Sequence, residues 1–275
     1  MTNVPTPDTS GEMETVTSAD GTTIAYERTG SGPPLLLVHG TSANRTAWRL
    51  VLPGLEEHVT AYAVDRRGRG ESGDADEYGL EQEADDVAAV VDSIDDPVTL
   101  LGHSGGGLFS LEAALRTDNL HKLILYEPSV SIDGHEFSAD EVRAEMKALL
   151  DSGENEQAVV LFLQEVANFS PEELDTLRAA PTWQDRVDAA HTVYREVKVE
   201  ADYEFDADRF ADMTTPTMLL SGSESPPRYK SAVDAVNDAL PNSRITTIDG
   251  HAHVAYYTAP ERFTDEVLAF TVEPN

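Results

Sequence analysis

The chain has 275 residues, long enough for one large α/β domain, and it contains no cysteine, which excludes disulfides and thiolate-ligated metal or iron–sulfur sites. Its 19 lysine and arginine residues stand against 51 aspartate and glutamate residues, a formal net charge of −32. Such a surface repels phosphate backbones and anionic lipid, so we expect neither nucleic acid nor a membrane as partner, and we predict adaptation to high salt, which screens the self-repulsion.

The first residues, MTNVPTPDTSGEMETV, lack the basic and apolar regions of a secretory signal. No later run approaches the roughly 18 apolar residues of a membrane span. We therefore expect a cytoplasmic protein with a flexible N-terminal tail over residues 1–12. Residues 14–29 then alternate around a glycine-containing turn, which predicts an antiparallel hairpin.

Short apolar runs follow the hairpin and predict strands that are buried on both faces, as in a parallel sheet. These runs cover residues 35–40, 60–65, 98–103, 122–128, 217–222 and 244–249. Helical periods lie between or after several of them, at residues 80–94, 107–117, 229–240 and 260–272. The alternation predicts an α/β fold with a mostly parallel, doubly wound sheet.

One interval between strands, after residues 122–128, is too long for a single crossover. It carries helical patterns at residues 138–153 and 154–168. We predict a helical cap insertion over residues 133–212, with the core formed by residues 13–132 and 213–275.

The stretch LLGHSGGGLF places Ser104 between Gly102 and Gly106, after a predicted strand and at the start of a predicted helix. Gly-x-Ser-x-Gly in this context indicates a nucleophile elbow, in which the serine occupies a sharp, strained turn. The amide of Gly105 would then point toward a developing oxyanion. A phosphate-binding loop is the alternative, but the lysine of that motif is missing.

Five motifs occur together in the order and at the spacings of a known family: LLLVHGTSANRTAWRLV, YAVDRRGRGESG, LLGHSGGG, LLSGSESPP and GHAHVAYYTAPERF. The chain resembles the α/β-hydrolase fold family, in its serine esterase and cofactor-free haloperoxidase-like branch. The resemblance covers nearly the whole chain except the tail and the insertion. The motifs are highly specific for the fold, but they say little about the substrate.

The resemblance also assigns roles to residues near the predicted elbow. Thr41, which follows His39 and Gly40, would supply the second oxyanion-hole amide beside Gly105, while His39 itself would hold that loop. The triad acid follows the serine and precedes the histidine in chain order. Glu224 matches the usual position of the acid after the strand at 217–222, and Glu127 in LYEPS is the rival.

The stretch DGHAHVAYY contains two histidines with the spacing of a metal pair, His251 and His253, but no further ligand pattern accompanies them. We therefore expect neither a metal nor a cofactor. In the family the catalytic histidine precedes the proline of the final helix by seven residues, and Pro260 follows His253 by seven. The resemblance thus implies that His253 is the general base and His251 a loop residue.

The predicted function is cleavage of a small carboxylic ester or related acyl substrate by Ser104, His253 and Glu224 through an acyl-enzyme. A carbon–carbon bond hydrolase or an acyltransferase on the same triad remains open, as does a hydrolase-like receptor with slow turnover. The substrate and the oligomeric state are not predicted.

Overall fold

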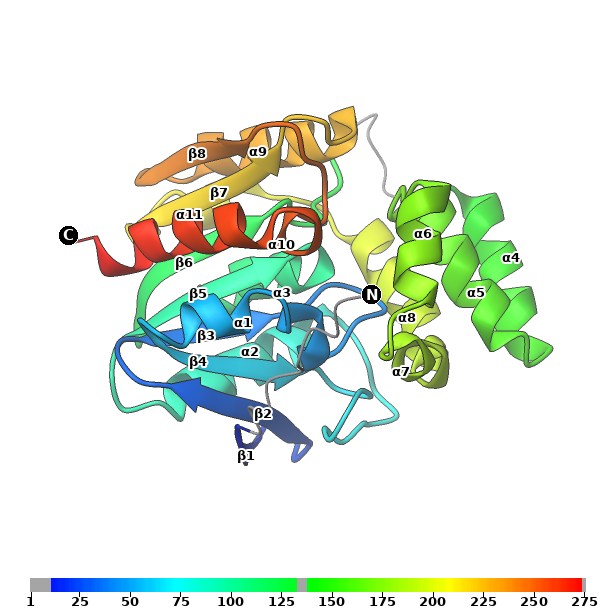
Figure 1. Cartoon of the computed structure of the whole chain (residues 1–275), viewed down its shortest axis with the longest axis horizontal. Coiled ribbons are helices and arrows are strands. Elements are labelled where there is room, and N and C mark those ends of the chain that lie inside the picture. Colours follow the sequence, from blue (N-terminus) through cyan, green and yellow to red (C-terminus); the bar gives the residue numbers. More distant parts are fainter. Residues whose placement is uncertain (1–10, 133–137, 274–275) are drawn as a thin grey trace, which may run out of the picture.

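The computed structural model describes residues 11–132 and 138–273 (Figure 1). Across these residues it contains an eight-stranded sheet in the order β1-β2-β4-β3-β5-β6-β7-β8. The first two pairings, β1 with β2 and β2 with β4, are antiparallel, and the others are parallel. The strands are β1 Glu12–Thr17, β2 Thr23–Gly30, β3 Pro34–Val38, β4 Thr60–Asp65, β5 Val98–His103, β6 Leu120–Tyr126, β7 Thr217–Gly222 and β8 Ser243–Ile248.

The predicted fold class is confirmed, and the hydrophobic pattern of the sequence explains it. Every residue of β3, β4, β5 and β7 is buried, as expected for strands covered by helices on both faces. The hairpin strands β1 and β2 lie at one edge of the sheet and are more exposed: β1 has no buried residue, and β2 has buried residues only at Ile24, Ala25 and Tyr26.

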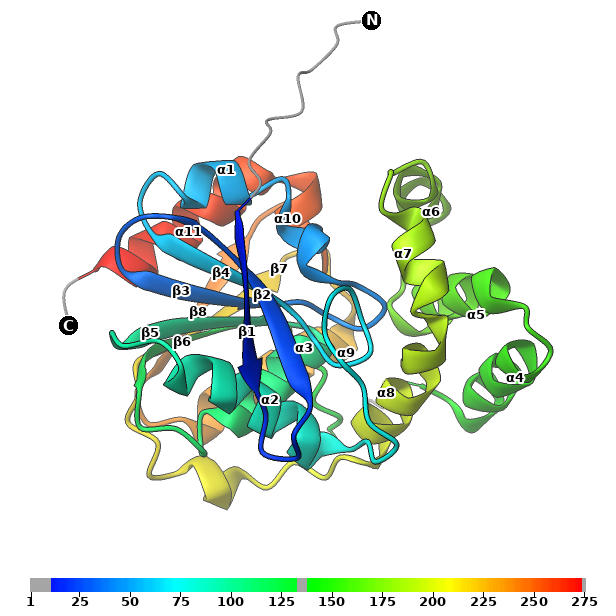
Figure 2. The ribbon, with the colours of Figure 1, turned by 90° about the horizontal axis from the view of Figure 1, so that it is seen from below.

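Two apolar layers enclose the sheet, and Figure 2 shows helices above and below it. On one face the layer includes side chains of α2 Leu80–Asp92, α3 Gly105–Ala113 and α9 Pro227–Ala239. On the other face it includes side chains of α1 Leu52–Leu55, α10 Ala255–Thr258 and α11 Pro260–Val272, with the short η1 Arg45–Trp48. Within the described residues no helix is both long and apolar enough to cross a membrane.

A separate group of helices lies between β6 and β7 in the chain and beside one end of the sheet in Figures 1 and 2. It has its own apolar cluster, built around residues such as Met146, Phe162 and Val193. The elements are α4 Asp140–Asp151, α5 Asn155–Leu161, the π-helical η2 Phe162–Val166, α6 Pro171–Arg178, α7 Trp183–Asp188 and α8 Ala190–Asp202. The short η3 Ala207–Phe210 follows them in the chain, but its Phe210 packs in the core layer of α2, α3 and α9.

The predicted division into tail, core and cap remains a prediction. Residues 1–10 of the predicted tail and residues 133–137 at the predicted cap boundary lie outside the described residues. Glu12, which we expected in the tail, is instead the first residue of β1 and pairs with Arg28. The tail prediction is therefore too long at its C-terminal end.

Candidate active site

The turn after β5 has the strained backbone of a nucleophile elbow. Ser104 has a φ of 54° and a ψ of −124°, a conformation that few non-glycine residues adopt. A Cβ on Gly102 would lie 2.4 Å from Ser110 Oγ, and one on Gly106 would lie 2.3 Å from the carbonyl oxygen of His39. Both flanking positions therefore require glycine, and Ser104 directly precedes the first turn of α3.

The loop after β3 passes next to this elbow. A Cβ on Gly40 would lie 3.1 Å from Ser104 Cβ, and one on Gly105 would lie 2.5 Å from Thr41 Oγ1. Thr41 and Gly105, the two predicted oxyanion donors, are thus neighbours. Among the described residues neither of their N–H groups has a hydrogen-bond acceptor, so both remain available to a ligand.

His39 fixes this loop and does not face a reacting atom. Its Nδ1 lies 2.9 Å from the carbonyl oxygen of Gly40, and its Nε2 accepts a hydrogen bond from Arg66 N–H at 3.2 Å. Burial, together with nearby arginines, holds the pKa of His39 well below its ordinary value. The neutral ring therefore acts as a structural link, as its position in the sequence predicted.

His253 is held from several sides in the loop after β8. Its ring stacks on Tyr229 with centroids 4.0 Å apart, and the hydroxyl of Tyr126 hydrogen-bonds to the backbone on both sides of it, at Ala252 and Ala255. Its Nδ1 lies 2.7 Å from Glu127 Oε2. Because Nδ1–H donates to this carboxylate, Nε2 carries the lone pair, and it has no partner among the described residues.

The prediction that Glu224 holds this imidazole is wrong, because the structure brings Glu127 there instead. Glu224 is exposed, and its carboxylate accepts the hydroxyl of Ser223 at 3.1 Å. Glu127 is fully buried and also accepts hydrogen bonds from Gly222 N–H at 2.8 Å and from Ser221 Oγ at 3.3 Å.

The backbone after β6 explains this outcome. We expected residues 122–128 to be extended, but β6 ends at Tyr126 and Glu127 has a φ of 43°. This left-handed turn lets the carboxylate sit across the end of β7 while the Glu127 N–H still donates to the carbonyl of Leu220. Glu224 instead donates its N–H to the carbonyl of His251 at 3.0 Å, and its exposed side chain makes no hydrogen bond to His253.

Ser104 and His253 line one small cavity of about 20 Å³, with Thr41 and with Phe162 and Leu163 of the π turn η2 above them. Ser104 Oγ lies 3.2 Å from Ser129 Oγ, its one hydrogen-bond partner in the described part of the chain. The serine hydroxyl and the free Nε2 thus face a shared space that a reacting atom could enter.

The two histidines of the stretch DGHAHVAYY lie in different environments. His251 is on the outer side of its loop, with Nδ1 3.0 Å from Thr258 Oγ1, whereas His253 is buried. In residues 11–132 and 138–273 no group of three or more potential ligands is placed to hold a metal ion.

Sequence reasoning missed several residues around the site. His103 packs its ring against that of His253, with centroids 4.5 Å apart, and burial keeps its pKa well below the ordinary value. Glu200, from α8, accepts the hydroxyl of Thr41 at 2.6 Å. The position of His103 inside the elbow could have indicated the first of these; no local motif indicates the second.

Buried charges join α8 to the core beneath this site. Arg66 donates to Glu83 of α2 through two nitrogens, at 2.7 and 2.9 Å, and lies 3.2 Å from Glu196 of α8. Arg69 also pairs with Glu196. The motif DRRGRG therefore contacts both α2 of the core and α8 of the helices between β6 and β7.

A strained serine after a central strand, a carboxylate-bound histidine after the last strand and two free amides beside the serine define a hydrolase of the α/β class. The comparisons agree with this class. The model of the Alpha/beta hydrolase family matches residues 35–266, and the chain belongs to this family.

Similar proteins include enzymes and solved structures. A pimeloyl-[acyl-carrier protein] methyl ester esterase of Aeromonas hydrophila is 27% identical over 254 residues, which cover 90% of this chain and 98% of that protein. A putative carbamate hydrolase RutD of Azorhizobium caulinodans is 27% identical over 263 residues, 90% of this chain and 94% of that one. The structure of an α/β hydrolase from Sphaerobacter thermophilus is 32% identical, with a TM-score of 0.82 over 94% of this chain and 99% of that one.

Proposed function

We propose that the protein is a serine hydrolase that cleaves a small carboxylic ester or related acyl substrate through a Ser104–His253–Glu127 triad. The observation that carries this proposal is the 2.7 Å hydrogen bond between His253 Nδ1 and Glu127, beside the cavity that Ser104 lines. It leaves the basic nitrogen of the ring directed away from the acid and free to accept the serine proton.

In the first half of the reaction, Ser104 Oγ attacks the ester carbonyl carbon while His253 Nε2 takes the hydroxyl proton. The carbonyl oxygen becomes an oxyanion, which the N–H groups of Thr41 and Gly105 stabilise. Glu127 holds the ring tautomer and stabilises the imidazolium. The imidazolium then gives its proton to the alkoxide, the alcohol leaves, and Ser104 carries the acyl group.

In the second half, His253 takes a proton from water, and the resulting hydroxide attacks the acyl carbon. The bond to Ser104 Oγ breaks, the serine recovers its proton from the imidazolium, and the carboxylic acid leaves. Before the first step, the Ser104 hydroxyl must give up its contact with Ser129 and turn toward Nε2. Contacts of this kind commonly rearrange when substrate binds.

A fluorophosphonate probe tests the nucleophile, because it phosphonylates activated serines. We expect labelling of the intact protein in molar salt and no labelling of Ser104→Ala. Folded wild-type protein that stays unlabelled contradicts the proposal. If such a protein nevertheless binds esters, it is the receptor that the sequence left open.

The choice of acid is tested by comparing Glu127→Gln with its matched control Glu224→Gln in ester hydrolysis. Glu127→Gln should lower kcat by about 10⁴-fold, the cost of losing a triad acid, because the amide cannot stabilise the imidazolium. Glu224→Gln should leave kcat close to wild type, since within the described residues its carboxylate accepts a hydrogen bond from Ser223 and none from His253. The reverse order of the two variants would restore Glu224 as the acid.

Four finer predictions accompany this proposal. The placement in the serine esterase and cofactor-free haloperoxidase-like branch rests on the five sequence motifs. The assignment of residues 133–212 as a cap is supported by the separate apolar cluster around Met146, Phe162 and Val193, whereas Tyr203 and Phe210 pack with the core. Salt adaptation is supported by the net charge of −32, and the cytoplasmic location stays a prediction.

A further inference from the structure

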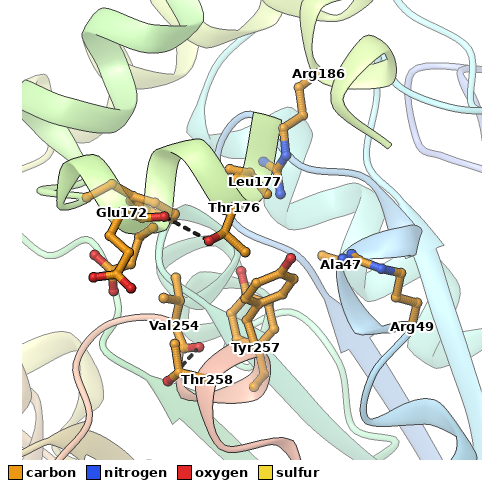
Figure 3. Close-up of a pocket in the computed structure, with 12 residues that line it drawn as sticks. Ala47, Arg49, Glu172, Thr176, Leu177, Arg186, Val254, Tyr257 and Thr258 are labelled. Carbon is orange, nitrogen blue, oxygen red and sulfur yellow. Dashed lines mark hydrogen bonds between the residues drawn. The ribbon is translucent and has the colours of Figure 1, made fainter. Parts of the chain in front are cut away.

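A second cavity, of about 250 Å³, adjoins the small cavity at Ser104 (Figure 3). It lies between α6 and α7 on one side and η1 and α10 on the other. Phe169, Arg186, Val254 and Tyr256 line both cavities, so the larger one opens toward the candidate nucleophile. A substrate attacked at Ser104 can therefore extend into it.

Two arginines enter this second cavity without a carboxylate partner. Arg186, from α7, donates through Nη1 to the carbonyl oxygen of Ser42 at 2.8 Å and to its Oγ at 3.1 Å, which leaves Nε and Nη2 with no acceptor among the described residues. Arg49 packs its guanidinium 5.1 Å from the centre of the Tyr257 ring. No described carboxylate lies within 4.0 Å of either guanidinium.

This lack of partners is unusual in so acidic a chain, in which most described arginines form ion pairs with carboxylates. Burial lowers the pKa of Arg186, and the neighbouring Arg49 lowers it further. An arginine keeps its charge even so. Arg49 and Arg186 line the same cavity as two partly buried positive charges, which an anion bound in that cavity would stabilise, and the planar fork of a guanidinium matches a carboxylate.

The acidic residues of the cavity wall do not fill this role. In Figure 3, Glu172 lies on the opposite side from Arg186 and Arg49, and it is exposed. The carboxylate of Glu173 is engaged in the capping box at the start of α6, where it accepts from both the N–H and the hydroxyl of Ser170 at 2.8 Å. Among the described residues, Arg49 and Arg186 therefore have no carboxylate in direct contact, and Asp185 acts on Arg186 only from a longer distance.

We propose that this cavity selects esters that carry a carboxylate, which Arg49 and Arg186 bind while Ser104 attacks the ester carbonyl. The inference rests on the proposed serine-hydrolase function and names its substrate class: half-esters of short dicarboxylic acids and related monoanionic esters. Arg186 also donates a hydrogen bond to Ser42, in the same loop as Thr41. The same side chain would therefore bind the substrate carboxylate and hold the loop of the oxyanion hole.

The test compares two esters that differ only at one end. Monomethyl glutarate ends in a carboxylate and methyl pentanoate in a methyl group, and methanol release is followed for both at about 1 M salt, where long-range repulsion by the acidic surface is screened. We expect the wild type to have the higher kcat/KM for monomethyl glutarate. The same comparison is made with ester pairs of shorter and longer carbon chains, so that one of them matches the distance from Ser104 to the arginines.

Arg49→Gln should lower the ratio of the two kcat/KM values by about 10- to 100-fold, mainly through KM, because it removes a charge-assisted hydrogen bond. Arg116→Gln is the matched control: it removes the same charge from a surface pair with Asp85, and the ratio should not change. Arg186→Gln should lower turnover of both esters as well as the ratio, since it also releases Ser42.

An unchanged ratio in folded Arg49→Gln overturns the inference, as does a wild-type preference for the neutral ester at every chain length. Failure of the proposed function looks different: neither ester is hydrolysed and the probe does not label Ser104. In that case calorimetric titration with glutarate decides the inference separately. Binding that Arg49→Gln abolishes supports it, and equal or absent binding in both proteins refutes it.

Discussion

Glu200 offers a prediction in which the pH dependence of folding can be worked out from the structure. The side chain is 2% exposed, lies on α8 and accepts the hydroxyl of Thr41. Burial raises the pKa of Glu200 from 4.5 to about 7, although Thr41 and two nearby arginines, Arg66 and Arg69, favour its charged form. The native protein therefore holds a proton that the unfolded chain has already lost near neutral pH.

The sign follows from linkage. A raised carboxyl pKa stabilises the fold in full below about 4.5, and this contribution is lost as pH rises through about 7. The shift of 7 − 4.5 = 2.5 units corresponds to about 3 kcal/mol. Glu200→Gln mimics the protonated group, because the amide is neutral and its oxygen can still accept the Thr41 hydroxyl.

We therefore expect Glu200→Gln to exceed the wild type in free energy of unfolding by up to about 3 kcal/mol at pH 8, and the difference to vanish near pH 4.5. Urea denaturation from pH 4.5 to 9 at constant molar salt measures the difference. Glu204→Gln, at an exposed position two residues after α8, is the control and should give a flat profile. A difference that does not vary with pH, or a less stable variant at pH 8, would refute the reasoning.

Two further predictions concern the oxyanion loop and the surface charge. Gly105→Ala should lower kcat by roughly 10- to 1,000-fold, because its displaced N–H would no longer stabilise the oxyanion. The new Cβ would lie 2.4 Å from Glu200 Oε1 and 2.5 Å from Thr41 Oγ1. Unchanged steady-state kinetics would show that this N–H is not used. The melting temperature should rise between about 0.1 and 2 M potassium chloride, as screening relieves the repulsion among 51 acidic residues, and a constant value would contradict salt adaptation.

Much of the fold could be predicted from the sequence because its signals are local. The apolar runs that became β4, β5 and β7 were placed at their observed bounds, since a strand covered on both faces needs consecutive apolar residues. The position of Ser104 was equally local: the elbow requires glycine on both sides of the serine, and the sequence displays both. The choice of His253 came from the resemblance to the α/β-hydrolase family, in which the catalytic histidine precedes the proline of the final helix by seven residues.

The acid of the triad could not be decided in the same way. Glu127 and Glu224 both follow strands that neighbour each other in the sheet, so chain order and spacing allow either. The choice depends on a left-handed turn at Glu127 and on hydrogen bonds from Gly222 and Ser221, which lie more than ninety residues away in the chain.

The same limit applies to the residues that come from the helices between β6 and β7. In the sequence, Arg186 and Glu200 are ordinary charged positions on amphipathic helices. Only the docking of α7 and α8 against the core places Arg186 beside Ser42 and Glu200 beside Thr41. Sequence by itself predicted the main strands and the elbow, because their requirements lie in neighbouring residues. Only the tertiary structure brings Glu127 to His253 and Arg186 into the cavity, because burial and pairing depend on surfaces that meet only in the folded chain.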